Sequence, residues 1–262
     1  MQTCCNSIGP PEMGETGGTV QGLLADFNDP LVRDTAARLT RDVPDVREKL
    51  ARLFYYVRDD IEFGFPPKAD LTTASETIRL GMGQCNTKGT LFLNLCKAAG
   101  IPARLHFSLI RKDIQRGLFE GLAYRLLPPL LSHSWLEVEL DGSWRRLDGY
   151  INDAPFFDAA REALRRCGWS TGFSVADAEG QASIAFDPEA ERFVQMQAVV
   201  HDHGVWDDPA DYYQSPAYRN RPGALRLLMY RLLIGGINKK IAAMRQARHR
   251  DSRQVPTAVP DR

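Results

Sequence analysis

Residues 136–148 read LEVELDGSWRRLD, and this stretch predicts a β-hairpin. Apolar and polar residues alternate from Leu136 to Leu140, as in a strand with one buried face, and Asp141-Gly142 is the strongest short signal for a two-residue turn. With that turn, Glu137 lies opposite Arg146 as an opposite-charge pair. The leucines and the valine then gather on the other side, which faces the core.

The same register predicts a contact between a histidine and a carboxylate. His133 lies just before the alternating residues and would pair with Tyr150, while Asp148 ends the returning strand. His133 and Asp148 are then diagonal neighbours on one face of the sheet, within reach of each other's side chains.

A cysteine lies upstream at the start of a predicted helix. Residues 81–89 read GMGQCNTKG, and the apolar spacing that follows predicts a helix over 86–99, ended by Gly100 and Pro102. Cys85 then lies at the N-cap or in the first turn, where the helix dipole and free N–H groups favour a thiolate. Cys96 lies on the apolar stripe of the same helix and is predicted to be a buried core residue.

Cys85, His133 and Asp148 are therefore the candidate nucleophile, general base and orienting carboxylate. The backbone N–H of Cys85 is the expected oxyanion donor. The side chain of Gln84 could add a second donor, or it could serve the turn instead.

Four motifs in order resemble the transglutaminase-like superfamily, whose core is papain-like: GMGQC (81–85), AGIPAR (99–104), HSWLEV (133–138) and WRRLD (144–148). The resemblance covers residues 51–158 and puts Cys85, His133 and Asp148 at the family's catalytic positions. It implies an α+β fold in which N-terminal helices, including the nucleophile helix, pack on an antiparallel sheet that bears the histidine and the aspartate. It does not fix the reaction.

Composition indicates a globular protein of ordinary make-up. The chain has 262 residues, of which 44% are hydrophobic and 25% charged, with a net charge of zero. This balance gives no electrostatic case for nucleic acid. Five cysteines, the lack of a signal peptide and the lack of a transmembrane segment favour a reducing, cytoplasmic location.

The remaining N-terminal half is predicted to be scaffold. Residues 1–20, with Cys4 and Cys5, form a Gly/Pro-rich leader that we expect to be mobile. Helices are predicted over 31–39 and 44–61, with Pro44 in the first turn of the second. A capping box at Thr73 opens a short third helix, and 103–110 is a predicted strand. The long link over 111–132 could shape a substrate cleft or be a plain insertion.

The sequence implies neither a cofactor nor a metal. His201 and His203, with nearby aspartates, have no third ligand at a recognised zinc spacing, so we expect a polar loop there. No EF-hand pattern appears, so a calcium requirement like that of animal transglutaminases is not supported.

The C-terminal residues 219–262 are predicted to form a basic helix and tail after a catalytic domain over 21–218. Ten lysines and arginines stand between Arg219 and Arg253 against one acid, Asp251. An apolar stripe starts at Leu225 and is interrupted by Gly235-Gly236. The segment could bind an acidic partner or a membrane surface, or it could dock on the chain's own acidic surface.

The function we expect from these residues is cysteine-dependent acyl transfer on a peptide, protein or small amide. The thioester on Cys85 would pass to water in a peptidase or amidase, or to an amine in an acyltransferase. The alternative is a catalytically silent protein that keeps the fold as a binding scaffold.

Overall fold

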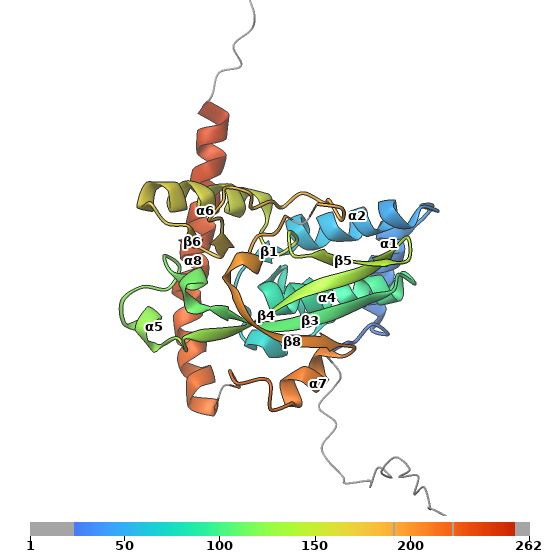
Figure 1. The fold of residues 1–262 in the computed structure, drawn as a ribbon, viewed down its shortest axis with the longest axis horizontal. Helices are drawn as coiled ribbons and strands as arrows, with labels where there is room; N and C mark the ends of the chain where they lie inside the picture. The colour runs from blue at the N-terminus through green and yellow to red at the C-terminus, as the bar shows by residue number, and fades with distance from the viewer. Residues whose placement is uncertain (1–23, 191, 222, 255–262) are drawn as a thin grey trace, which may run out of the picture.

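The computed structural model describes residues 24–190, 192–221 and 223–254 (Figure 1). The predicted leader over 1–20, Cys4 and Cys5 included, lies outside these residues. The helices are α1 (Pro30–Thr40), α2 (Val46–Tyr55), α3 (Ala74–Leu80), α4 (Cys85–Ala98), α5 (Gly121–Leu126), α6 (Ala154–Cys167), α7 (Pro209–Gln214) and α8 (Ala224–Gln254). The strands are β1 (Glu62–Phe63), β2 (Met82–Gly83), β3 (Ala103–Arg111), β4 (Leu130–Leu140), β5 (Ser143–Leu147), β6 (Thr171–Gly172), β7 (Val175–Ala176) and β8 (Val199–Trp206). Short 3-10 turns are η2 (Ala69–Leu71), η3 (Lys112–Gln115) and η4 (Met196–Ala198), and η1 (Tyr56–Asp60) is a π-helical turn.

An antiparallel sheet of four strands, in the order β5-β4-β3-β8, organises the molecule (Figure 1). Its β4–β5 hairpin has the predicted register, with Glu137 opposite Arg146. Asp141 and Gly142 have φ values of 51° and 74°, the left-handed conformations that a type I′ turn requires. The predicted α+β class and hairpin are confirmed.

The fourth strand, β8, was not predicted. It covers the His201–His203 segment, which we expected to be a polar loop, and pairs antiparallel with β3 at the sheet edge. The expectation was wrong because backbone hydrogen bonds to β3 hold this segment as a strand. Its polar side chains do not have the alternating pattern that would predict one. The pairing is irregular, with register shifts on either side of Ser108 and Leu109.

Helix α4 packs against β3 and β4 and lies at the centre of the core. Every residue from Asn86 to Cys96 is buried, so the predicted burial of Cys96 is confirmed. Gly89 allows a close approach to the sheet, because a Cβ there would lie 3.0 Å from the Tyr150 hydroxyl and 3.1 Å from Ser134 Oγ. The helix that begins at Cys85 is thus pressed directly onto the strand that carries His133.

The N-terminal helices pack on α4 as scaffold. The second begins at Val46 rather than Pro44, because the Asp45 side chain accepts the Glu48 N–H and so caps the helix. The capping box at Thr73 is present at the start of α3. The long link before β4 contains η3 and α5, so it is neither a plain loop nor a hairpin turn.

The C-terminal segment forms one helix, α8, which crosses the ends of the central strands in Figure 1. The helix runs without a break through Gly235-Gly236, where the apolar stripe is interrupted. Ile234, Ile237 and Ile241 are buried on one face, and Arg245 forms ion pairs with Asp153 and Glu62. The helix therefore docks on acidic groups of the chain itself, as one of the expected alternatives has it.

Among the described residues, no helix is both long enough and apolar enough to cross a membrane.

Candidate active site

Cys85 is the first residue of α4, and Gln84 caps the helix. The Gln84 side-chain oxygen accepts the Asn86 N–H at 2.9 Å, and the Gln84 backbone N–H donates to Thr87 Oγ1 at 3.0 Å. These reciprocal bonds fix the first turn, so the half-buried thiol stands at the positive end of the helix dipole, as predicted.

The surroundings of the thiol favour its protonated form. Burial raises the pKa of Cys85, and the negative charge of Asp70 raises it further. The backbone N–H groups of Ser134, Asn86 and Cys85 oppose this by favouring the thiolate, but their effect is smaller. The expectation of a lowered pKa is therefore not met, because a helix start alone does not offset burial and a nearby carboxylate.

The contact with the Ser134 N–H places the sulphur against β4. Ser134 directly follows His133, and β5 ends at Leu147, so this part of β4 has no strand beside it on the hairpin side. The thiol of Cys85 therefore lies at that open edge of β4, against the residue that follows His133.

Gln84 faces the thiol with its oxygen and turns its NH₂ group away. Its Oε1 accepts from Cys85 Sγ at 2.9 Å, whereas its Nε2 donates to Asp70 Oδ1 at 2.6 Å. The backbone N–H of Asn86 can donate only to the amide oxygen of Gln84, and the carboxylate of Asp70 can accept only from its NH₂ group. These two partners fix the orientation of the amide. The geometry favours the capping role for Gln84 over the oxyanion role.

Asp70, in the turn η2, is the site residue that the sequence did not reveal. Its carboxylate accepts hydrogen bonds from Gln84, from Asn86 Nδ2 at 3.0 Å and from the Tyr218 hydroxyl at 2.8 Å. Burial raises the pKa of Asp70, and these three hydrogen bonds lower it in part. No local pattern marks Asp70, because its partners come from two distant parts of the chain.

His133 is fully buried on β4, and neither ring nitrogen has a hydrogen-bond partner among the described residues. Burial lowers the pKa of His133 to about 3, so the imidazole is neutral at physiological pH. A neutral imidazole with a free nitrogen can accept a proton from a thiol. Buried polar atoms without a hydrogen bond are rare in folded proteins, and a catalytic role is one of the explanations for them.

Asp148 is also buried, but its hydrogen bonds go to another segment. Its two oxygens accept the backbone N–H groups of Val194 and Gln195, each at 2.8 Å. Burial raises the pKa of Asp148 to about 7, against the opposing effect of these backbone N–H groups. The expected hydrogen bond between His133 and Asp148 is absent from this structure, because the segment before η4 supplies backbone donors that occupy the carboxylate.

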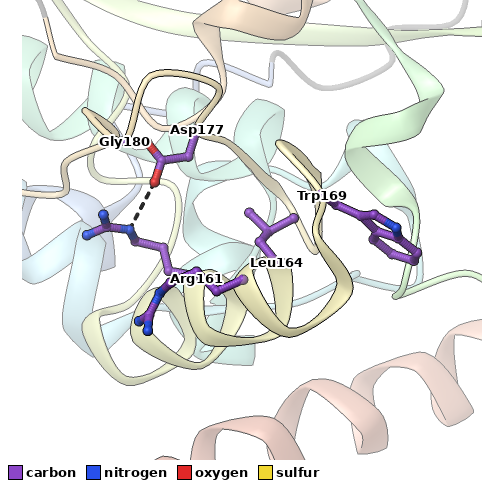
Figure 2. Close-up of a pocket in the computed structure, with 6 residues that line it drawn as sticks. Arg161, Leu164, Trp169, Asp177 and Gly180 are labelled. Atoms are coloured by element: carbon purple, nitrogen blue, oxygen red, sulfur yellow. Dashed lines mark hydrogen bonds and ion pairs between the residues drawn. The ribbon is translucent and has the colours of Figure 1, made fainter.

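A hollow lies away from these residues, against α6 (Figure 2). It has a volume of about 170 Å³ and is lined by Arg161, Leu164, Arg165, Trp169, Asp177 and Gly180. Arg161 is already paired with Asp177 at 3.0 Å, as the dashed line in Figure 2 shows. It contains none of the predicted site residues and carries no thiol chemistry.

The histidines of β8 do not form a metal site in the structure. Across the described ranges, no three histidine, cysteine or acidic side chains are grouped so that they could hold a metal ion. His203 Nδ1 instead lies 3.0 Å from the Tyr212 hydroxyl.

A comparison with family models agrees with the motifs. Residues 33–149 match the family model of the transglutaminase-like superfamily. A putative cysteine protease from Cytophaga hutchinsonii shares 16% identity over 72% of this chain, with a TM-score of 0.43. A putative protease from Parabacteroides distasonis shares 18% identity over 48% of this chain, with a TM-score of 0.33. This chain spans 46% of the first of these structures and 25% of the second. No curated protein gives a significant match.

Proposed function

Residues 33–149 carry the core of the transglutaminase-like superfamily, and on that premise we propose that the protein is a cysteine-dependent acyl-transfer enzyme. The observation that carries the proposal is the position of Cys85. Its sulphur stands at the start of a buried helix, beside the backbone N–H of Ser134, the residue that follows His133 in β4.

In the proposed reaction, the Cys85 proton passes to His133 and the sulphur attacks the carbonyl carbon of an amide. The backbone N–H of Cys85 holds the oxyanion, and His133 returns the proton to the leaving amine. The thioester is then cleaved by water, as in a peptidase or amidase, or by a second amine, as in a transglutaminase-type acyltransferase. His133 takes the proton of the incoming water or amine in either case.

Asp148 is the proposed group that stabilises the imidazolium formed in these steps. In this role it must turn toward His133 from its present bonds to Val194 and Gln195. The substrate class is a peptide, a protein or a small amide. We also propose a reducing compartment, the cytoplasm, because the described cysteines, Cys85, Cys96 and Cys167, are free thiols.

The test is to capture the acyl-enzyme. The protein is incubated with a panel of amide and ester acyl donors, and the modified residue is located by mass spectrometry. We expect an adduct on Cys85 that hydroxylamine removes, as it does any thioester. Cys85→Ala should lose the adduct, whereas Cys167→Ala, which removes an exposed thiol, should keep it. A folded protein that never forms an adduct on Cys85 would contradict the proposal.

The competing candidate is a silent scaffold, and two observations favour it. The pKa of the thiol is raised, and His133 lacks the hydrogen bond to a carboxylate that would orient it. Turnover of any donor that is lost in both Cys85→Ala and His133→Ala would exclude the scaffold.

A further inference from the structure

Helix α8 has a second apolar face that points away from the protein. Leu225, Leu228, Met229 and Leu232 are 72%, 55%, 47% and 70% exposed. Their spacing of three and four residues places them on one stripe of the helix. Ile234, Ile237 and Ile241, which dock the helix, lie on the opposite side.

The first half of α8 is thus apolar on both sides. A helix of this kind is normally buried all round, in a protein core or in lipid. Here one side contacts the chain's own core, through Ile234 and through Tyr230, whose hydroxyl donates to the Pro66 carbonyl. The other side has exposed leucines and still needs an apolar environment.

The charged residues that α8 itself places around the stripe are all of one sign, and one of them, Lys240, is paired with Glu120 at the start of α5. Residues 215–250 contain nine lysines and arginines and no acid. At 100° per residue, Arg226 and Arg231 lie at the two borders of the stripe, where a long cationic side chain reaches from an apolar surface to water or to an anion. Lys239 and Lys240 follow along the helix.

We propose that the outer face of α8 over residues 224–236 binds the surface of a membrane rich in anionic lipid. The leucines would enter the boundary between headgroups and acyl chains, and the bordering arginines would contact lipid phosphates. The opposite face stays docked through Ile237, Ile241 and Arg245, so the catalytic domain would rest at the surface without crossing it.

A second copy of the chain fits this face less well. Two such helices face to face would bring their arginines together, with no acidic residue in the segment to balance them. A lipid surface supplies apolar and anionic groups at once. An exposed pair of leucines on α5, Leu122 and Leu126, could widen the contact, since an ion pair between Lys240 and Glu120 ties the start of α5 to α8.

The test is flotation of the full-length protein with vesicles. Vesicles of phosphatidylcholine containing about one third phosphatidylglycerol should carry the protein, and pure phosphatidylcholine vesicles should carry much less. Leu228→Gln/Leu232→Gln should weaken binding to the anionic vesicles about tenfold or more. Arg226→Gln should weaken it about fivefold, and added salt should weaken it further. The matched control is Leu80→Gln, which changes a leucine 43% exposed on α3 and should bind as the wild type does.

Three results would overturn the proposal. In the first, the wild type fails to float with the anionic vesicles. In the second, the double leucine variant floats as well as the wild type, so that binding depends on positive charge alone and not on the apolar face. The wild type could also form a dimer in sedimentation that the leucine variant cannot form, without binding vesicles. The face would then be a contact between copies of the chain. The alkylation rate of Cys85 should be equal in all variants, which separates this test from that of the proposed function.

Discussion

The Sγ of Cys85 donates a 2.9 Å hydrogen bond to Oε1 of Gln84. An amide oxygen is far too weak a base to remove the proton, so this arrangement is a resting state. In the proposed reaction the proton moves to His133, whose ring nitrogens have no hydrogen-bond partner among the described residues. Asp70 holds the Gln84 amide in this orientation and also disfavours the thiolate by its charge.

Asp70→Asn should therefore make Cys85 more reactive. Removing the negative charge lowers the pKa of the thiol, so a larger fraction is thiolate at a given pH. We expect alkylation by iodoacetamide at constant pH to be about two- to tenfold faster in the variant. Asp34→Asn, which changes an exposed carboxylate on α1, is the control and should leave the rate unchanged. An unchanged or lower rate in a folded Asp70→Asn protein would show that Asp70 only supports the fold here.

Much of the β4–β5 hairpin and of α4 could be predicted because their signals are local. The Asp141-Gly142 turn fixes the register of β4 and β5, and the cap at Gln84 fixes where α4 begins. Asp70 and the backbone donors of Val194 and Gln195 could not be predicted. They reach the site through long-range packing, which no spacing in the sequence encodes.

Asp148→Asn tests both the structural and the chemical role of this carboxylate. An asparagine keeps only one acceptor oxygen for the N–H groups of Val194 and Gln195, so we expect a loss of about 1–3 kcal/mol in the free energy of unfolding. If Asp148 also stabilises the imidazolium, kcat measured well below the melting temperature should fall by orders of magnitude. If the activity per folded molecule is unchanged in the variant, Asp148 has no chemical role and only anchors residues 194–196.

Glu137 and Arg146 share a register position, but the Glu137 carboxylate bonds to other partners. It accepts from Arg104 Nε and from His106 Nδ1, each at 2.8 Å. Glu137→Arg should cost about 3–5 kcal/mol of unfolding free energy, far more than the loss of an exposed cross-strand pair. Adding Arg146→Glu should recover little of it, because the Arg104 and His106 partners would still face a cation. Urea denaturation of both variants measures the free energy of unfolding. If the double variant recovered the full loss, Glu137 and Arg146 would interact mainly with each other as a cross-strand pair.

His106 should make stability depend on pH near neutrality. Burial lowers the pKa of His106, but hydrogen bonds to Glu137 and Asp202 outweigh this and raise it above its ordinary value. The folded state therefore binds the proton more tightly than the unfolded state. The resulting stabilisation is complete below about pH 6.5 and is lost as the pH rises through the raised pKa. His106→Gln should flatten the fall in unfolding free energy between about pH 6 and 8. An identical slope in the variant would assign the pH dependence to other groups.

Arg245 should be the principal polar anchor of α8. Its guanidinium bonds Asp153 at 2.9 and 2.7 Å, and it also reaches Glu62 and the Phe63 carbonyl. Burial alone would raise the pKa of Asp153, yet Arg245 holds it below its ordinary value, so the pair contributes stability that is lost as the pH falls through that lowered pKa. Arg245→Met should cost about 3–5 kcal/mol at neutral pH, because Asp153 is left buried and unpaired. The loss should shrink in acid, where Asp153 is protonated in both proteins.

The control is Arg226→Met, which changes an exposed position on the same helix and should stay within about 0.5 kcal/mol of the wild type. Equal losses in the two variants at neutral pH would mean that the buried ion pair does not hold α8 on the domain.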